Sequence, residues 1–214
     1  QMYAPEVLDE LISIAQSKQI VCIADEVMTG FGRTGKMFAC DYLKNDPDIF
    51  CLSKGITGGY LPMGVTAVSQ TIVEAFDVAD RLKAFFHGHS YTANPLACAA
   101  ANASMKLLLK KDCQQDIARI GASHKAYVEG FTPNERVDEI RYRGTILAIE
   151  LKADDAGYTS DIKERIYDYF MERNMLLRPL GNVIYIIPPY IVTNQELQKM
   201  YKALDSFLKE LLND

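Results

Sequence analysis

Apolar and polar positions along the first half of the chain predict helices and strands in alternation. A 3.6-residue spacing of apolar side chains indicates a helix over 5–18. Short apolar, β-branched runs bounded by turn residues indicate strands over 20–25, 48–52 and 64–69, and residues 84–87 are also strand-like. Helices that alternate with strands are typical of a mostly parallel sheet covered by helices, so we expect an α/β fold here.

A longer helix is expected to follow. Asn94 and Pro95 begin it, because Asn is a good helix N-cap and Pro fits the first helical turn. Its apolar face consists largely of small residues that permit close packing, with Leu96, Ala99, Ala100, Ala103 and Leu107. The pattern changes after this helix, so we place a domain boundary near residue 112 and expect domains over 1–112 and 113–214.

The second half has the pattern of a smaller α+β domain. Its apolar runs predict strands over 145–151 and 183–187 and a helix that begins at Asp161. A final helix opens with the capping box Thr193-x-x-Glu196. The apolar stripe of that helix comprises Leu197, Met200, Tyr201, Leu204, Leu208 and Leu211.

Composition and charge narrow the classes of partner. The 214 residues are 49% hydrophobic and 24% charged, as in an ordinary globular protein. A net charge of −5 argues against nucleic acid or an anionic membrane surface as partner, because both demand clustered Lys and Arg. The five cysteines show no C-x-x-C spacing, so we expect reduced thiols and a cytoplasmic protein without disulfides or zinc. The most apolar late stretch, 183–192, is too short to span a membrane.

The stretch VCIADEVMTGFGRTGKM, residues 21–37, comes close to two phosphate-binding motifs. Its glycines spell G-x-G-x-x-G, but Asp25 and Glu26 precede them and no amphipathic helix follows, so the dinucleotide fingerprint fails. A P-loop needs Ser or Thr after Lys36, where this chain has Met37, a poor ligand for Mg²⁺. The local sequence alone then indicates a tight surface loop after a buried strand.

Lys54 changes that interpretation. The segment LSKGITGG, residues 52–59, puts this lysine directly after a predicted strand, although a solvated surface lysine is the commoner case. Asp25 also ends a predicted strand, and such sheets bind ligands at the carboxyl ends of their strands. An acid and an amine at one ligand-binding edge suit pyridoxal phosphate (PLP). A lysine binds the aldehyde of PLP, and a carboxylate keeps its ring nitrogen protonated.

Three segments of the chain together resemble the class III (subgroup II) PLP-dependent aminotransferases of fold type I: ADEVMTGFGRTG, PDIFCLSKGITGGYLPMG and HGHSYTANPLACAAANAS. The resemblance covers nearly the whole chain. It implies that 1–112 is the C-terminal part of the PLP-binding large domain and that 113–214 is the small domain.

Two features resemble one branch of that family. Met28 stands where many relatives that act on ω-amino acids carry Gln, and LLRPLGNVIYIIPPYIV, residues 176–192, is similar to the branch's substrate segment. The resemblance implies transfer of an amino group from S-adenosylmethionine to 8-amino-7-oxononanoate, which gives 7,8-diaminononanoate in biotin synthesis.

The resemblance also implies the roles of the residues nearest the cofactor ring. Lys54 would be bound to PLP in the resting enzyme and would shuttle the proton once substrate displaces it. Asp25 would hold the ring nitrogen protonated by charge attraction, and Val27 would pack on the ring face.

The HGHS segment is implied to serve a second subunit. His89 and Ser90 would reach the cofactor phosphate of the neighbouring subunit, and Gly88 would lie close to the substrate, so a homodimer with shared sites is expected. Ser90 replaces the usual Thr but keeps the hydroxyl donor. His87 and His89 alternate on the predicted strand, but with only His124 as a further imidazole we expect no metal site.

Two residues of the C-terminal half have open alternatives. Arg178 could be an ordinary surface arginine, but the resemblance implies that it grips the carboxylate of the keto-acid substrate with its planar fork. Tyr185 could be a core aromatic of a strand, or it could lie by the amino donor, as the resemblance implies for enzymes that use adenosylmethionine.

The chain opens on a helix pattern without an initiating Met, so we expect a C-terminal fragment. In the family, a glycine–serine turn that takes most of the phosphate and an aromatic that stacks on the ring precede this region. The isolated fragment is therefore expected to be inactive and to bind PLP weakly. Two alternatives stay open: a class III aminotransferase with a lysine, ornithine or ω-amino acid donor, and a catalytically silent dimerising module.

Overall fold

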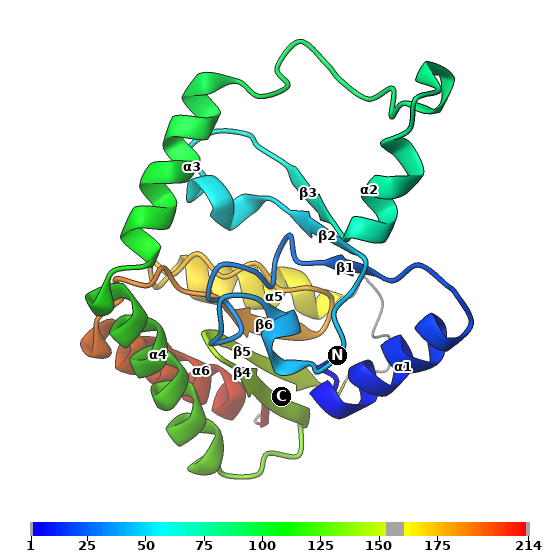
Figure 1. The fold of residues 1–214 in the computed structure, drawn as a ribbon. Helices are drawn as coiled ribbons and strands as arrows, with labels where there is room; N and C mark the ends of the chain where they lie inside the picture. Colours follow the sequence, from blue (N-terminus) through cyan, green and yellow to red (C-terminus); the bar gives the residue numbers. More distant parts are fainter. Residues whose placement is uncertain (1, 153–160, 213–214) are drawn as a thin grey trace. The chain divides into compact units, whose positions relative to one another are not determined.

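The computed structural model describes residues 2–152 and 161–212. The chain separates into two compact units, Gln1–Lys111 and Asp112–Asp214. Each unit has its own three-stranded sheet (Figure 1). Within the described ranges, no helix is long and apolar enough to cross a membrane.

The first sheet has the strand order β1-β2-β3. β1 (Ile23–Asp25) pairs in parallel with β2 (Ile49–Leu52), and β2 pairs antiparallel with β3 (Val65–Val68). The three strands lie within the predicted ranges, but the antiparallel third strand was not expected. The connection between β2 and β3 contains only a 3-10 turn, η2 (Lys54–Thr57), and no helix that could cross over the sheet for a parallel return.

The strand predicted over 84–87 is wrong. This segment is irregular and follows the short turn η3 (Arg81–Lys83). Its aromatic side chains are exposed, with Phe85 at 68% and Phe86 at 80%. A short apolar, aromatic run alone does not make a strand, because a strand needs a neighbouring strand to pair with its backbone N–H and C=O groups.

The helices of the first unit include two long ones. The long ones are α1 (Pro5–Ser17) and α3 (Pro95–Leu108), and the shorter elements are η1 (Ala39–Tyr42) and α2 (Gln70–Phe76). The predicted start of α3 is confirmed: the Asn94 side chain accepts hydrogen bonds from the backbone N–H groups of Leu96 (2.9 Å) and Ala97 (3.3 Å). The predicted small-residue face does not pack within this chain, because Leu96 is 71% exposed and Leu107 is 59% exposed. The buried residues of α3 are Ala97, Ala101 and Leu108, on another side of the helix.

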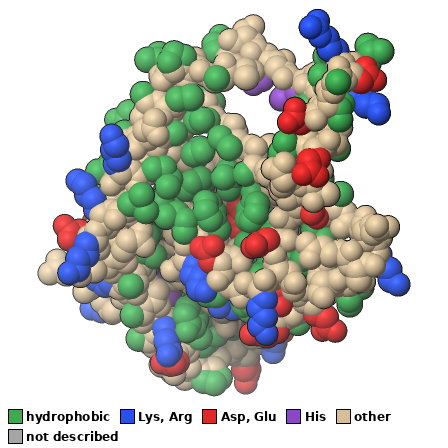
Figure 2. All heavy atoms as spheres, viewed as in Figure 1, with side chains coloured by type: hydrophobic (Ala, Val, Ile, Leu, Met, Phe, Trp, Pro, Cys, Tyr) green, Lys and Arg blue, Asp and Glu red, His purple; other side chains and the backbone are tan. Residues whose placement is uncertain are grey.

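Much apolar surface of the first unit is uncovered. No residue of α1 is buried, and Ile23 on the β1 edge is 63% exposed. A hollow of about 1560 Å³ lies among β2, β3, α2, α3 and the segment that carries His87 and His89. Figure 2 shows hydrophobic side chains gathered along α3 and an opening with histidine at its rim.

The second unit is an antiparallel sheet packed with helices, the α+β arrangement expected. β5 (Ile146–Leu151) lies between β4 (Val137–Arg143) and β6 (Val183–Ile186). Its helices are α4 (Lys111–Glu129), α5 (Asp161–Met171) and α6 (Asn194–Leu212). One contiguous core joins them, with the most buried members Ile120, Leu147, Ile149, Leu151, Ile166, Phe170, Ile184, Leu197, Leu204 and Phe207.

The capping box of α6 is confirmed. The Glu196 carboxylate accepts a hydrogen bond from the Thr193 N–H (2.8 Å), and the Thr193 hydroxyl accepts one from the Glu196 N–H (3.2 Å). The predicted apolar stripe of this helix faces the core. The side chain of Asp161, at the predicted start of α5, lies outside the described part.

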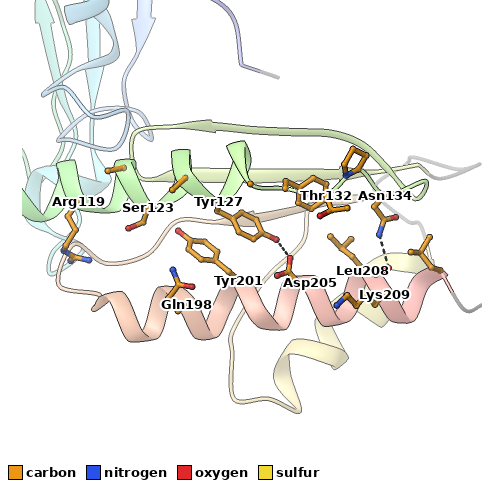
Figure 3. A pocket seen from close by; sticks show the side chains of 16 residues that line it. Arg119, Ser123, Tyr127, Thr132, Asn134, Gln198, Tyr201, Asp205, Leu208 and Lys209 are labelled. Atoms are coloured by element: carbon orange, nitrogen blue, oxygen red, sulfur yellow. Dashed lines mark hydrogen bonds between the residues drawn. The ribbon is translucent and has the colours of Figure 1, made fainter.

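A buried polar pair joins α4 to α6. His124 has no exposed surface, and its Nε2 lies 3.2 Å from the Thr145 carbonyl oxygen. Because that oxygen can only accept, Nε2 carries the hydrogen, and Nδ1 accepts from the Tyr201 hydroxyl at 2.8 Å. The Tyr201 ring stacks on Tyr127, whose hydroxyl donates to Asp205 (2.8 Å) along a groove of about 770 Å³ (Figure 3). Burial lowers the pKa of His124 to about 4.

His124 therefore makes stability depend on pH. Its folded-state pKa of about 4 lies below the ordinary value of 6.5, so the unfolded chain binds the proton more tightly. Stability should be complete above pH 6.5 and fall as the pH drops toward 4. The loss expected at pH 5, relative to pH 7.5, is about 2 kcal/mol.

Urea unfolding at the two pH values measures this loss. His124→Gln is the control, because an amide keeps a donor for the Thr145 carbonyl but does not titrate. An equal pH dependence in both proteins would contradict the assignment.

Candidate active site

The parallel pairing of β1 with β2 brings Asp25 and Lys54 to the same edge of the first sheet. The register aligns Asp25 with Cys51, and Lys54 follows three residues later. Neighbouring strands lie about 4.8 Å apart, so the two side chains leave from adjacent strand ends. Both residues are exposed.

Both charged groups at this edge are available to a ligand. The Asp25 carboxylate accepts one hydrogen bond, from the N–H of half-buried Val27 (3.0 Å). Across residues 2–152 and 161–212, the Lys54 amine makes neither a hydrogen bond nor an ion pair with another residue. Among the described residues neither group has an ion-pair partner, so both can face the same bound molecule.

The backbone of Lys54 is held in an unusual conformation. Its φ is +40°, in the left-handed region, which costs a residue with a side chain about 1–3 kcal/mol. Hydroxyl groups on either side fix the loop. Ser53 Oγ donates to the Met63 carbonyl (2.7 Å), and Thr57 Oγ1 donates to the Leu61 carbonyl (2.6 Å). These bonds define the direction in which the lysine leaves the sheet edge.

A buried glutamate, which the sequence analysis did not assign a role, anchors the glycine loop. Glu26 is only 1% exposed, and its carboxylate accepts hydrogen bonds from the Cys40 N–H (2.8 Å) and the Thr29 hydroxyl. Its backbone carbonyl accepts the N–H of Gly30 (3.0 Å). Burial, with the nearby Glu26 carboxylate as a smaller cause, raises the pKa of the Cys40 thiol to about 12. The sequence signal that could have revealed this role was Glu26 directly after a predicted strand, with the hydroxyl residue Thr29 three positions later.

Phe31 is a second residue that the sequence analysis did not assign. It lies inside the glycine loop, is 4% exposed and has a φ of +60°. Its side chain packs directly over Gly55, the residue after Lys54. The glycine loop that follows β1 therefore contacts the lysine loop that follows β2.

The HGHS segment belongs to the same unit but not to a strand. Gly88, His89 and Ser90 are exposed; the His89 N–H donates to Thr92 Oγ1 (2.8 Å), and His89 Nδ1 accepts from the Tyr91 N–H (3.1 Å). The segment is thus a hydrogen-bonded turn on the surface.

His87 and His89 do not lie on a strand, contrary to expectation. The ring centres of His87 and His89 are 6.4 Å apart, and His124 belongs to the second unit. Among the described residues, no three His, Cys, Asp or Glu side chains are grouped as metal ligands.

The remaining two candidates lie in the second unit. Arg178 is exposed just before Pro179 and lines a hollow of about 680 Å³ that Lys163 and Tyr167 also border. Tyr185 is half-buried on β6, paired with Ala148 of β5. The structure thus groups Asp25, Val27 and Lys54 at one edge of the first unit, and Arg178 and Tyr185 belong to the other unit.

Known proteins are similar to this chain in both sequence and fold. Residues 1–208 match the family described as Aminotransferase class-III. The adenosylmethionine-8-amino-7-oxononanoate aminotransferase of Synechococcus elongatus is 43% identical over 211 residues, which cover 99% of this chain and 49% of the relative. The Helicobacter pylori protein of the same name is 36% identical over 219 residues, 98% of this chain and 49% of the relative.

A solved structure agrees with these sequence matches. The crystal structure of the enzyme of that name from Methanocaldococcus jannaschii has a TM-score of 0.87 and 34% identity, and covers 97% of this chain and 50% of that one. The chain spans about half the length of the curated relatives it matches. With its Asp25–Lys54 edge and fold type I architecture, the chain belongs to the class-III aminotransferase family.

Proposed function

We propose that this chain is the C-terminal half of an aminotransferase of biotin synthesis. The enzyme transfers an amino group from S-adenosylmethionine to 8-amino-7-oxononanoate and gives 7,8-diaminononanoate. The observation that carries the proposal is the β1–β2 register, which puts Asp25 and Lys54 at one sheet edge. The names of the relatives in three organisms supply the substrates.

The residues at this edge fit PLP, because a carboxylate and an amine without an ion-pair partner in the described part of the chain leave adjacent strand ends. When bound, PLP withdraws electrons from the substrate carbon that carries the transferred nitrogen. Asp25 would keep the ring nitrogen protonated by its negative charge, and Val27 would pack on the ring. Lys54 would hold the cofactor aldehyde in the resting enzyme, and once substrate displaces it, its Nζ would be the base that takes the proton from the donor carbon.

The other candidates orient substrates. Arg178 binds the carboxylate of 8-amino-7-oxononanoate, since the guanidinium fork matches both carboxylate oxygens. Tyr185 lies by the amino donor. His89 and Ser90 would hold the cofactor phosphate of a second copy, and Gly88 would lie close to the substrate there, so we propose a homodimer with shared sites.

The remainder of the aminotransferase completes the first unit. The side chains of Val21 and of Ile23 on β1 are 50% and 63% exposed, as expected of a sheet face that other parts of the whole protein cover. The isolated chain is therefore inactive and binds PLP weakly. We also propose a cytoplasmic location, for which the support is the cysteine spacing in the sequence.

A donor screen tests the proposed reaction. The full-length enzyme is incubated with PLP, 8-amino-7-oxononanoate and S-adenosylmethionine, lysine, ornithine or an ω-amino acid in turn. Diaminononanoate should form with S-adenosylmethionine. If diaminononanoate formed only with another donor, the proposed donor would be wrong but the reaction class would stand. If no donor supported transamination, the proposal would be overturned.

Lys54→Ala in the full-length enzyme should abolish turnover while the protein stays folded. Without the amine, neither the covalent hold on the cofactor nor the proton transfer takes place, so we expect a loss of more than about 1,000-fold in kcat. Lys106→Ala, on an exposed face of α3, is the control and should keep normal turnover. A Lys54→Ala variant with turnover within about tenfold of the parent would refute the assignment.

Arg178→Ala should raise the KM for 8-amino-7-oxononanoate about ten- to a hundredfold, because a bidentate contact with a carboxylate contributes about 1.5–3 kcal/mol. The KM for S-adenosylmethionine should change much less. Lys163→Ala removes another cation from the same hollow and serves as the matched control. Equal effects of Arg178→Ala on both substrates would argue against the role.

A further inference from the structure

The loops that follow β1 and β2 each contain a residue with a left-handed backbone, and the first of these residues packs on the neighbour of the second. Phe31 has a φ of +60° and Lys54 a φ of +40°. Residues with side chains keep such angles only where their surroundings enforce them. Lys54 itself lies at the ligand-binding strand edge, and Phe31 follows Asp25 in the loop after β1.

The contact between the two loops involves Gly55. The three atoms nearest to a Cβ built on Gly55 all belong to Phe31: Cβ and Cδ2 at 2.9 Å, and Cγ at 3.1 Å. Even one methyl group is too large for this space, so the Phe31 side chain lies against the Gly55 backbone. On its other side, the Gly55 carbonyl accepts a hydrogen bond from Ser104 Oγ of α3 (3.2 Å). The residue after Lys54 is thus held between Phe31 and α3.

Phe31 is itself well fixed. It is 4% exposed, and its ring meets Phe38 edge-on with centres 5.6 Å apart. The loop that carries it is tied at its start by the buried Glu26 carboxylate, which binds the Cys40 N–H across the loop. Because Phe31 is fixed relative to the end of β1 and packs on Gly55, it also fixes the position of the loop that contains Lys54.

We propose that Phe31 is a positioning residue for the aminotransferase: by packing on Gly55, it holds the Lys54 backbone in the left-handed conformation that aims the amine at the ligand-binding edge. This role rests on the proposed function of Lys54 as the PLP-binding lysine. Phe31 touches neither substrate nor cofactor in this role and acts through the lysine loop alone.

The test compares Phe31→Leu with Phe38→Leu in the full-length, PLP-loaded enzyme. Both variants remove one ring from the same aromatic cluster, but Phe31 alone supplies the atoms closest to Gly55. Phe31→Leu should lower kcat at least about tenfold while the KM for S-adenosylmethionine changes less than about threefold. Phe38→Leu should leave kcat within about threefold of the parent.

Two readouts do not depend on turnover. The pH midpoint of the absorption band of bound PLP reports the surroundings of the Lys54 nitrogen, and Phe31→Leu should move it by about half a unit or more. The Gly59 N–H donates to the Lys54 carbonyl at 3.3 Å. Its hydrogen exchange should accelerate about tenfold or more in Phe31→Leu, with no such change in Phe38→Leu.

Gly55→Ala changes the Phe31–Gly55 contact from the glycine side, and it replaces Phe31→Leu in the test if that variant does not fold. Its added methyl group overlaps Phe31, so the same fall in kcat and the same shift of the pH midpoint are expected. The proposal is overturned if the parent is active but the tested variant matches Phe38→Leu in kcat and pH midpoint. A parent without transamination or PLP absorption overturns both this role and the proposed function.

Discussion

The parallel pairing of β1 with β2 is the constraint on which the candidate site depends. Its register is fixed at both ends: Cys22 and Asp48 exchange hydrogen bonds at the start, and the Glu26 N–H donates to the Cys51 carbonyl (3.0 Å) at the end. A slip of one residue would turn Asp25 to the opposite face of the sheet. The short strands thus set the relative positions of the acid and of Lys54.

The loops that follow these strands fix the direction in which the Asp25 and Lys54 side chains leave the sheet edge. Glu26 closes the loop after β1, and two hydroxyl bonds close the loop after β2. Phe31 and Gly55 link the two loops through a contact that excludes even a methyl group. Backbone strain at Phe31 and Lys54 is consistent with a functional site, because strained residues persist where the neighbouring structure over-determines them.

The two units differ in how completely this chain covers their apolar surface. The second unit has a contiguous core with residues from the β5 and β6 strands and all three helices. The first unit buries few large apolar side chains among its described residues, chiefly Phe31, Ile56 and Leu108. A chain that spans about half of its relatives accounts for this contrast, since the rest of a sheet normally covers such edges.

The sequence by itself determined the elements whose signals are local. Asn94 and Pro95 start α3, the Thr193–Glu196 box starts α6, and β-branched runs give β1 and β2, because caps and periodicity act within a few residues. It did not reveal α4, whose apolar face is interrupted by His124. That residue is neutral and buried only because Thr145 and Tyr201 satisfy it from elsewhere in the chain.

Only the tertiary structure decided the antiparallel return of β3, the irregular 84–87 segment, the burial of Glu26 and the packing of Phe31 on Gly55. Each depends on partners far apart along the chain, which no local pattern encodes.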